Sequence, residues 1–183
     1  MLAPGLLPRF FDRVARRAFA DLGLDDGPVV AYLAGLCTRF ARAEALERIE
    51  ALPGRRLGTV VDALLEIQKV WEAPETDFDP RRERTLRRHI GDVALFMSGL
   101  FPEHVERLGV KDHYRLEGER AYRFVAELAR AGGEADAPLY RRLADRFEHF
   151  AGALTYMRKV YFRPDQLPPG LRPDDPLWRR LIA

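Results

Sequence analysis

The sequence predicts an all-α fold, a single-domain bundle of about six helices with a Pro-rich, extended C-terminal tail. Apolar residues recur at spacings of three and four along most of the 183 residues, and no stretch alternates with a period of two. Glycine and proline fall between these periodic segments, where they end helices. The chain has no asparagine, and so none of the Asn-Gly turns that mark two-residue hairpins. We assign residues 1–162 to the bundle and 163–183 to the tail, docked on the same domain or on a partner.

Three helices are predicted in the first half. The first runs from Pro8 to about residue 22, and we expect its apolar stripe to pack in the core rather than lie on a membrane. The second begins at Pro28, a favoured first helical position, and reaches about residue 52. The third covers about 57–71. Beside the stripe of the first helix lie four basic residues: Arg9, Arg13, Arg16 and Arg17.

The fourth predicted helix covers about 80–100, with Asp79 as N-cap and Pro80 at its first position. Its first half is rich in charged residues. Its second half is apolar on almost every side, and only Asp92 and Ser98 interrupt the apolar residues there. A helix without a polar face is surrounded by protein, so this second half should be the centre of the bundle.

Two further long helices follow a short one. The short helix opens at Pro102, and Asp112 is expected to cap a helix that reaches about residue 131 and ends at two glycines. The last long helix is predicted over 138–162. Apolar residues within 177–182 suggest a short closing helix in the tail.

Composition excludes several classes of protein. The chain is 47% apolar with a net charge of +2, which is too apolar for disorder and gives no general case for nucleic acid. No stretch is long and apolar enough to span a membrane. The single cysteine, Cys37, excludes an internal disulfide and is expected to be a packed core residue. The Arg-rich, Asn-free composition suggests a bacterial source, and the interrupted N-terminal apolar run suggests a cytoplasmic location.

Familiar catalytic signatures are missing. Ser98 is the only serine and does not lie in a G-x-S-x-G elbow. The sequence has no H-E-x-x-H, no Glu-x-x-His, and no Gly-rich phosphate loop. We therefore predict no cofactor and no metal site, and whether the chain is an enzyme is left open.

Asp92 is the main candidate site residue, because an ionised carboxylate in an apolar helix must be paired. One interpretation is a buried aspartate that fixes helix register beside Gly91 and Gly99, glycines that mark close backbone approach. The other is a pocket base or ligand anchor. The candidate pocket comprises His89, Asp92, Tyr114, His113 and Glu117.

The two interpretations predict different surroundings for Asp92. Full pairing by arginine and tyrosine donors, without a cavity, would favour the structural role. Convergence of His89 and His113 on an unpaired Asp92 would favour a pocket. The candidate donors lie one turn back and on the following helix: Arg88, and a residue such as Tyr114, Arg115 or Arg120.

Three histidines have a carboxylate three or four positions away, an arrangement that could hold a metal or orient a base. With 28 acidic residues in 183, about half of all histidines would have such a neighbour by chance. We therefore interpret the pairs mainly as ordinary helix-surface neighbours: His89–Asp92, His113–Glu117 and Asp145–His149.

An arginine-rich stretch at 81–88 is a candidate anion-binding surface. Cations in a first helical turn oppose the helix dipole, which a bound phosphate would relieve. Alternatively, the acidic residues at 72–79 already compensate them. No aromatic residue interleaves these arginines, which disfavours nucleic acid. The candidate residues are Arg81, Arg82, Arg84 and Arg88.

Residues 87–122 carry a pattern of Gly91-Asp92, Leu95-Phe96, Ser98-Gly99 and Phe101, followed by Tyr114 and a segment from Gly118 to Tyr122. This pattern resembles an uncharacterised bacterial all-helical family. The resemblance implies no activity and no catalytic residues, but it directs attention to the region around Asp92 and Tyr114.

Taken together, these features favour a helical binding or interaction module that uses the tail or the arginine surface for contact with a protein partner or a second copy. The alternative is a helical enzyme or a small-ligand or metal-binding protein with a pocket around Asp92, His89 and Tyr114.

Overall fold

The computed structural model describes residues 5–41, 80–163 and 165, and these residues form seven α-helices and no strand. The all-α prediction is confirmed. The helices are α1 (Leu6–Asp21), α2 (Gly27–Ala41), α5 (Pro80–Leu100), α6 (Pro102–Arg107), α7 (Lys111–Ala131), α8 (Ala137–Asp145) and α9 (Phe147–Tyr161). The predicted helix at 57–71 and the predicted closing helix of the tail lie outside the described residues.

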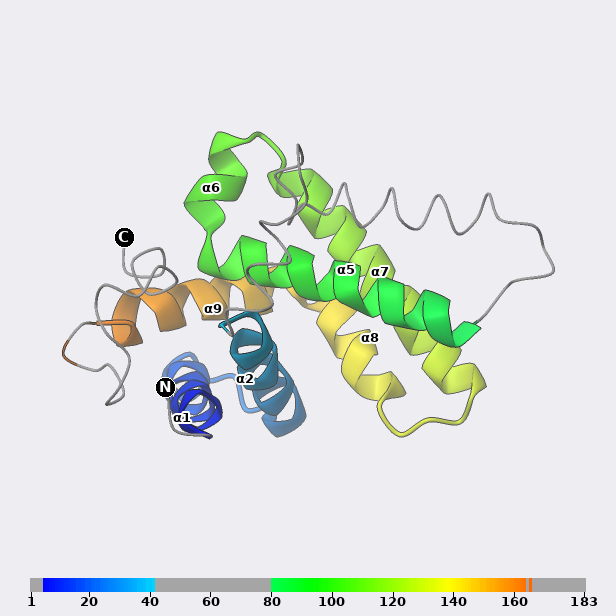
Figure 1. The fold of residues 1–183 in the computed structure, drawn as a ribbon, viewed down its shortest axis with the longest axis horizontal. Coiled ribbons are helices and arrows are strands. Elements are labelled where there is room, and N and C mark those ends of the chain that lie inside the picture. Colours follow the sequence, from blue (N-terminus) through cyan, green and yellow to red (C-terminus); the bar gives the residue numbers. More distant parts are fainter. Residues whose placement is uncertain (1–4, 42–79, 164, 166–183) are drawn as a thin grey trace.

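Helix α5 occupies the centre, as its apolar second half predicts. It lies beside α7 along much of its length and crosses α9 near its own C-terminal end (Figure 1). Every residue from Ile90 to Phe96 is buried, as are Gly99 and Leu100. The packing is closest at the glycines. A β-carbon at Gly91 would lie 2.7 Å from Cε1 of Tyr122, and one at Gly99 would lie 2.6 Å from Cβ of Leu154. The predicted close approach at both glycines is confirmed.

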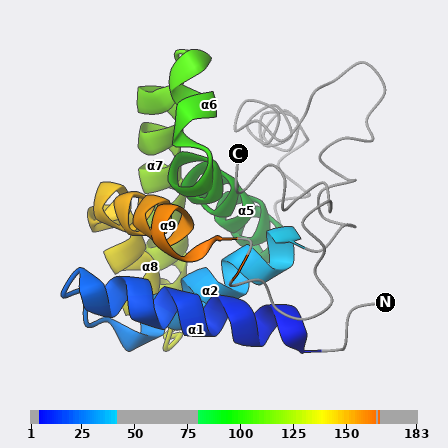
Figure 2. The same ribbon diagram turned by 90° about the vertical axis from the view of Figure 1, so that its left-hand side faces the viewer.

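The predicted helix 138–162 is wrong in one respect, because it is broken at Arg146. That residue leaves the helical region (φ −124°, ψ 29°) and separates α8 from α9. The break allows α8 to pack on α7 while α9 packs on α5 and α1, as Figures 1 and 2 show. A continuous helix could not reach both sets of neighbours.

The predicted cap at Asp112 is also wrong, because α7 begins at Lys111 and its N-cap position is Val110, two residues earlier than expected. Asp112 instead lies in the first turn, where a carboxylate complements the helix dipole.

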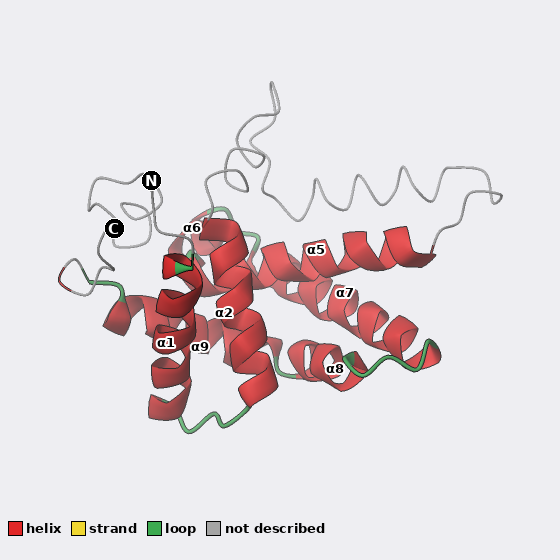
Figure 3. Cartoon of the chain, turned by 60° about the horizontal axis from the view of Figure 1, so that its bottom comes forward, coloured by secondary structure: helices red, strands yellow, loops and turns green. Residues whose placement is uncertain are grey.

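Helices α1 and α2 form an antiparallel pair joined by a short turn at one end of the bundle (Figure 3). The apolar stripe of α1 is buried, including Phe10, Phe11 and Phe19, so core packing of this helix is confirmed. Cys37 of α2 is 1% exposed and is a core residue, as predicted.

Candidate functional site

Asp92 is a buried, fully paired carboxylate. It is 4% exposed, and its three donors come from two other helices. The hydroxyls of Tyr32 and Tyr122 donate to Oδ1 at 2.5 and 2.9 Å, and Arg39 donates to Oδ2 at 2.8 Å. Both oxygens are therefore occupied, and Asp92 joins α2, α5 and α7.

The donors of Asp92 differ from those expected from the sequence. Arg88, one turn back on α5, is not among the three residues that donate to Asp92. Arg115 pairs with Glu119 at 3.1 Å, and Arg120 pairs with Glu117 at 2.9 Å. The predicted kinds of donor are confirmed, because arginine and tyrosine side chains donate all three hydrogen bonds. The particular residues that were expected to donate them are wrong.

The tyrosines around Asp92 form an aromatic cluster. The Tyr32 ring meets those of Tyr122 and Tyr140 edge-on, and the Arg39 guanidinium lies 5.6 Å from the centroid of Tyr32. Burial, followed by the charge of Asp92, raises the pKa of both Tyr32 and Tyr122. These hydroxyls therefore stay protonated and act as donors. The cluster holds helices together and leaves neither carboxylate oxygen without a donor.

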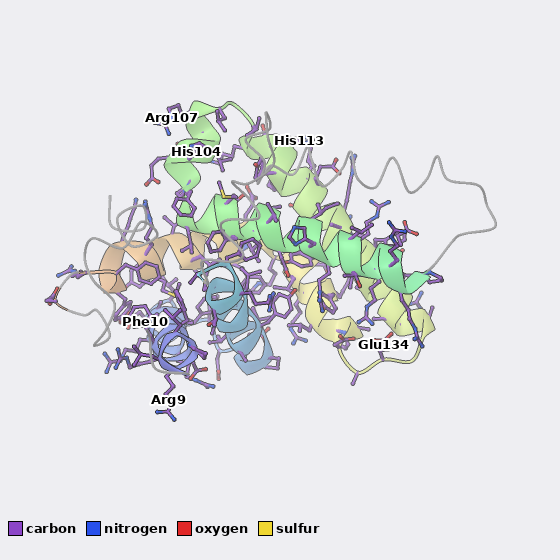
Figure 4. All side chains as sticks on the ribbon, in the orientation of Figure 1. Arg9, Phe10, His104, Arg107, His113 and Glu134 are labelled. Atoms are coloured by element: carbon purple, nitrogen blue, oxygen red, sulfur yellow. The ribbon has the colours of Figure 1, made fainter. Side chains whose placement is uncertain are left out.

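Of the five candidate pocket residues, the structure brings His89 near Asp92 and leaves three apart. His89 stacks on Phe40 with ring centroids 6.3 Å apart. His113, Tyr114 and Glu117 belong to the N-terminal part of α7; Tyr114 lies about 12 Å along the helix from Tyr122, given a rise of 1.5 Å per residue. Figure 4 shows His113 on the part of α7 that lies next to α6. The five side chains do not converge.

The carboxylates of the three histidine pairs bind arginines instead. Asp92 pairs with Arg39, Glu117 with Arg120, and Asp145 with Arg141 at 2.9 Å. Within the described part of the chain, no three His, Cys, Asp or Glu side chains gather in a way that could hold a metal.

The candidate anion-binding arginines divide into two groups. Arg84 pairs with Asp136 at 2.9 Å and with Glu134, so it is engaged inside the fold, whereas Arg88 is exposed. Arg81 and Arg82 are exposed in the first turn of α5. The compensating acidic residues expected at 72–79 lie outside the described residues, but the loop between α7 and α8 supplies Glu134 and Asp136 to Arg84.

A second arginine surface lies on α1. Arg9, Arg13 and Arg17 are exposed, follow one another at i, i+4 and i+8, and form no ion pair with the described residues. Arg16, beside them, pairs with Asp12 at 2.9 Å. Figure 4 shows Arg9 pointing away from the body of the protein. We call Arg9, Arg13 and Arg17 the α1 arginine stripe.

The stripe was visible in the sequence, but its neighbours were not. The periodicity placed the four arginines beside the apolar stripe, which could not reveal whether another helix would cover or neutralise them. The described structure leaves all four exposed, and among the described residues only Arg16 has a carboxylate partner.

This chain was compared with known protein families, curated proteins and solved structures. No protein-family model, no curated protein and no solved structure matches it. The resemblance carried by residues 87–122 therefore stays a prediction. None of the described helices combines the length and apolar character needed to cross a bilayer.

Proposed function

We propose that this protein is a non-catalytic interaction module, and that the α1 arginine stripe binds an acidic helical segment of a partner protein. The observation that carries the proposal is the stripe itself. Three cations lie on one exposed helix face without an ion pair to any residue of 5–41 or 80–163, whereas arginines of other helices, such as Arg84 and Arg141, are paired with carboxylates.

The arrangement of the stripe is unfavourable for the isolated helix. Like charges at i and i+4 destabilise a helix by about 0.2–0.5 kcal/mol per pair. Arg9 lies near the N-terminus of α1, where a cation opposes the dipole, and the first turn has no acidic residue. A negatively charged partner would relieve both effects.

The geometry favours a helical partner. Arg9 and Arg17 are about 12 Å apart along the axis, with Arg13 midway between them. Glutamates at i, i+4 and i+8 of a second helix have the same spacing, so three charged pairs could form together. The phenylalanines of α1 are buried, so the stripe offers neither an aromatic platform for bases nor an apolar face for lipid.

The alternative, an enzyme or ligand-binding site around Asp92, His89 and Tyr114, has weaker support. It requires a carboxylate that can accept a proton or a ligand, and the three donors on Asp92 oppose this.

Binding of synthetic peptides tests the proposal. The probe is a helical peptide with glutamate at three successive i, i+4 positions, compared with a twelve-base-pair DNA duplex. We expect the full chain to bind the peptide in a salt-dependent manner, and the triple variant Arg9→Gln, Arg13→Gln, Arg17→Gln to bind at least about tenfold more weakly.

A second triple variant controls for net charge. Arg107→Gln, Arg120→Gln and Arg141→Gln also removes three exposed arginines, and it should keep wild-type affinity. Equal losses in the two variants, or binding of the duplex in preference to the peptide, would overturn the proposal.

A further inference from the structure

A pocket of about 230 Å³ lies where α5, α6, α7 and α9 meet, and part of its lining is apolar. A cavity of roughly 150 Å³ is sufficient to hold benzene, so this pocket has room for one apolar side chain of the size of leucine or phenylalanine. The apolar part of the lining is formed by the half-buried Pro102 and by the buried Val105, Phe147 and Ala151.

Charged side chains of both signs line the same pocket. Lys111 and Arg115 lie four positions apart on one face of α7, and Glu148 lies in the first turn of α9. All three can be reached from solvent, because the exposed fraction of the side chain is 64% for Lys111, 30% for Arg115 and 70% for Glu148. A ligand in the pocket therefore meets two cations and one carboxylate.

The carboxylate of Glu148 is available to a ligand. Its Oε1 lies 3.7 Å from Nε of Arg115, which is too long for a hydrogen bond, and Glu148 makes no other ion pair with the described residues. An ammonium group of a ligand could therefore donate to Glu148 without displacing a hydrogen bond.

The two cations have partners that a second carboxylate could share. Lys111 pairs with Glu106 at 3.1 Å, but both side chains are exposed, and such surface pairs are weak. Arg115 donates from Nη1 to Glu119 at 3.1 Å, and its Nε remains able to donate. An ammonium has three donor hydrogens and a guanidinium has five. A ligand carboxylate can therefore accept from both cations while their present partners stay in place.

A ligand with a single charge fits this lining less well than a zwitterion does. An anion would be repelled by Glu148, and a cation would be repelled by Lys111 and Arg115. An α-amino acid carries an ammonium and a carboxylate on the same carbon, so each of its charges can face the opposite charge of the lining.

We infer that the pocket binds a free α-amino acid with an apolar side chain. That side chain packs against Pro102, Phe147 and Ala151. The carboxylate accepts hydrogen bonds from Lys111 and Arg115, and the ammonium donates to Glu148. This inference is independent of the proposed contact through α1, because no residue of α1 lines the pocket.

Four probes test the parts of the ligand separately: L-phenylalanine, 3-phenylpropanoate, phenethylamine and L-alanine. The second lacks the ammonium, the third lacks the carboxylate, and the fourth keeps both charges but lacks the ring. Titrations of the full chain followed by NMR chemical shifts give the dissociation constants. We expect about 1 mM or below for L-phenylalanine, with shifts at Val105 and Phe147, and at least about fivefold weaker binding of the other three probes.

Substitutions of exposed charges locate the two polar contacts. Glu148→Gln should weaken binding of L-phenylalanine about threefold to tenfold without weakening that of 3-phenylpropanoate, because only the amino acid uses this carboxylate. Arg115→Gln should weaken binding of L-phenylalanine by a similar factor without weakening that of phenethylamine. Glu127→Gln, which removes an exposed carboxylate of α7 outside the pocket, should change none of these dissociation constants.

Several results would overturn the inference. These are binding of any other probe as tight as that of L-phenylalanine, unchanged affinity in Glu148→Gln or Arg115→Gln, an equal loss in Glu127→Gln, or no binding of L-phenylalanine below about 10 mM. Circular dichroism melts of each variant establish that it is folded during the titration.

Discussion

The ring of Tyr122 lies where a β-carbon of residue 91 would have to be. Cε1 of Tyr122 is 2.7 Å from that position, and the hydroxyl of the same tyrosine donates to Asp92, the next residue along α5. The absence of a side chain at Gly91 therefore allows Tyr122 to reach the buried carboxylate. The close packing of α5 on α7 and the pairing of Asp92 are one structural feature.

Replacing Gly91 by alanine should destabilise the protein, although alanine favours helix. The added methyl group would displace the Tyr122 ring, and we expect a cost of about 1–3 kcal/mol in the free energy of unfolding, measured by urea denaturation. Gly152→Ala is the matched control. Because its β-carbon meets open space, it should stabilise the protein by about 0.5–1 kcal/mol. A stabilising Gly91→Ala would contradict the packing described for Tyr122.

Removing the Asp92 side chain should be costly. Asp92→Ala leaves two buried tyrosine hydroxyls without their acceptor, and we expect a loss of about 3–5 kcal/mol in urea unfolding. The half-exposed pair of Asp145 with Arg141 gives the comparison. Asp145→Ala should cost no more than about 1 kcal/mol. Similar small losses in both variants would show that the Asp92 cluster contributes little to the fold.

His89 should make stability depend on pH on the acid side of neutrality. His89 is exposed on one side, but desolvation of its ring by the surrounding protein lowers its pKa; the charge of Asp92 acts in the opposite direction, and the charges of Arg39 and Arg88 lower the pKa further. As the pH falls, the unfolded chain therefore takes up the proton at a higher pH than the folded chain does. The stability that neutral His89 contributes above the ordinary pKa of about 6.5 is lost as the pH falls below that value.

Urea unfolding of the wild type and of His89→Gln between about pH 7.5 and 5 measures this contribution. The variant should lose less stability over that range than the wild type. An equally steep loss in the variant would assign the pH dependence to other groups.

Cys37 should be unreactive in the folded protein. The thiol is buried in the core, and burial raises its pKa to about 12, so very little thiolate is present at neutral pH. A thiol-specific chromogenic disulfide should modify one cysteine per chain in denaturant and react in native buffer only as fast as the protein opens. Immediate reaction in native buffer would place Cys37 outside the core.

The spacing of apolar and helix-breaking residues in the sequence predicted the features that depend on neighbours along one helix. The span of α5, the burial of its second half and the close approaches at Gly91 and Gly99 follow from period, composition and helix-breaking residues. Tyr122 is not among the donors expected for Asp92, although it continues the i, i+4 series of Tyr114 and Gly118. That series was the signal that could have found it.

Features that depend on distant parts of the chain were not predictable in the same way. Tyr32 and Arg39 lie 60 and 53 positions from Asp92, and no local pattern pairs them. The break at Arg146 depends on the positions of α1, α5 and α7. The pocket lined by Ser98, Val105 and Phe147 is formed by residues of four helices, α5, α6, α7 and α9.

A charge-swap experiment tests the central claim, contact through the α1 arginine stripe, most directly. Wild type and the variant Arg9→Glu, Arg13→Glu, Arg17→Glu are each titrated with the glutamate peptide and with its lysine counterpart. We expect binding in the two combinations of opposite charge and at least about tenfold weaker binding in the two combinations of like charge. A folded variant that keeps its affinity for the glutamate peptide, or fails to bind the lysine peptide, would contradict the proposed contact.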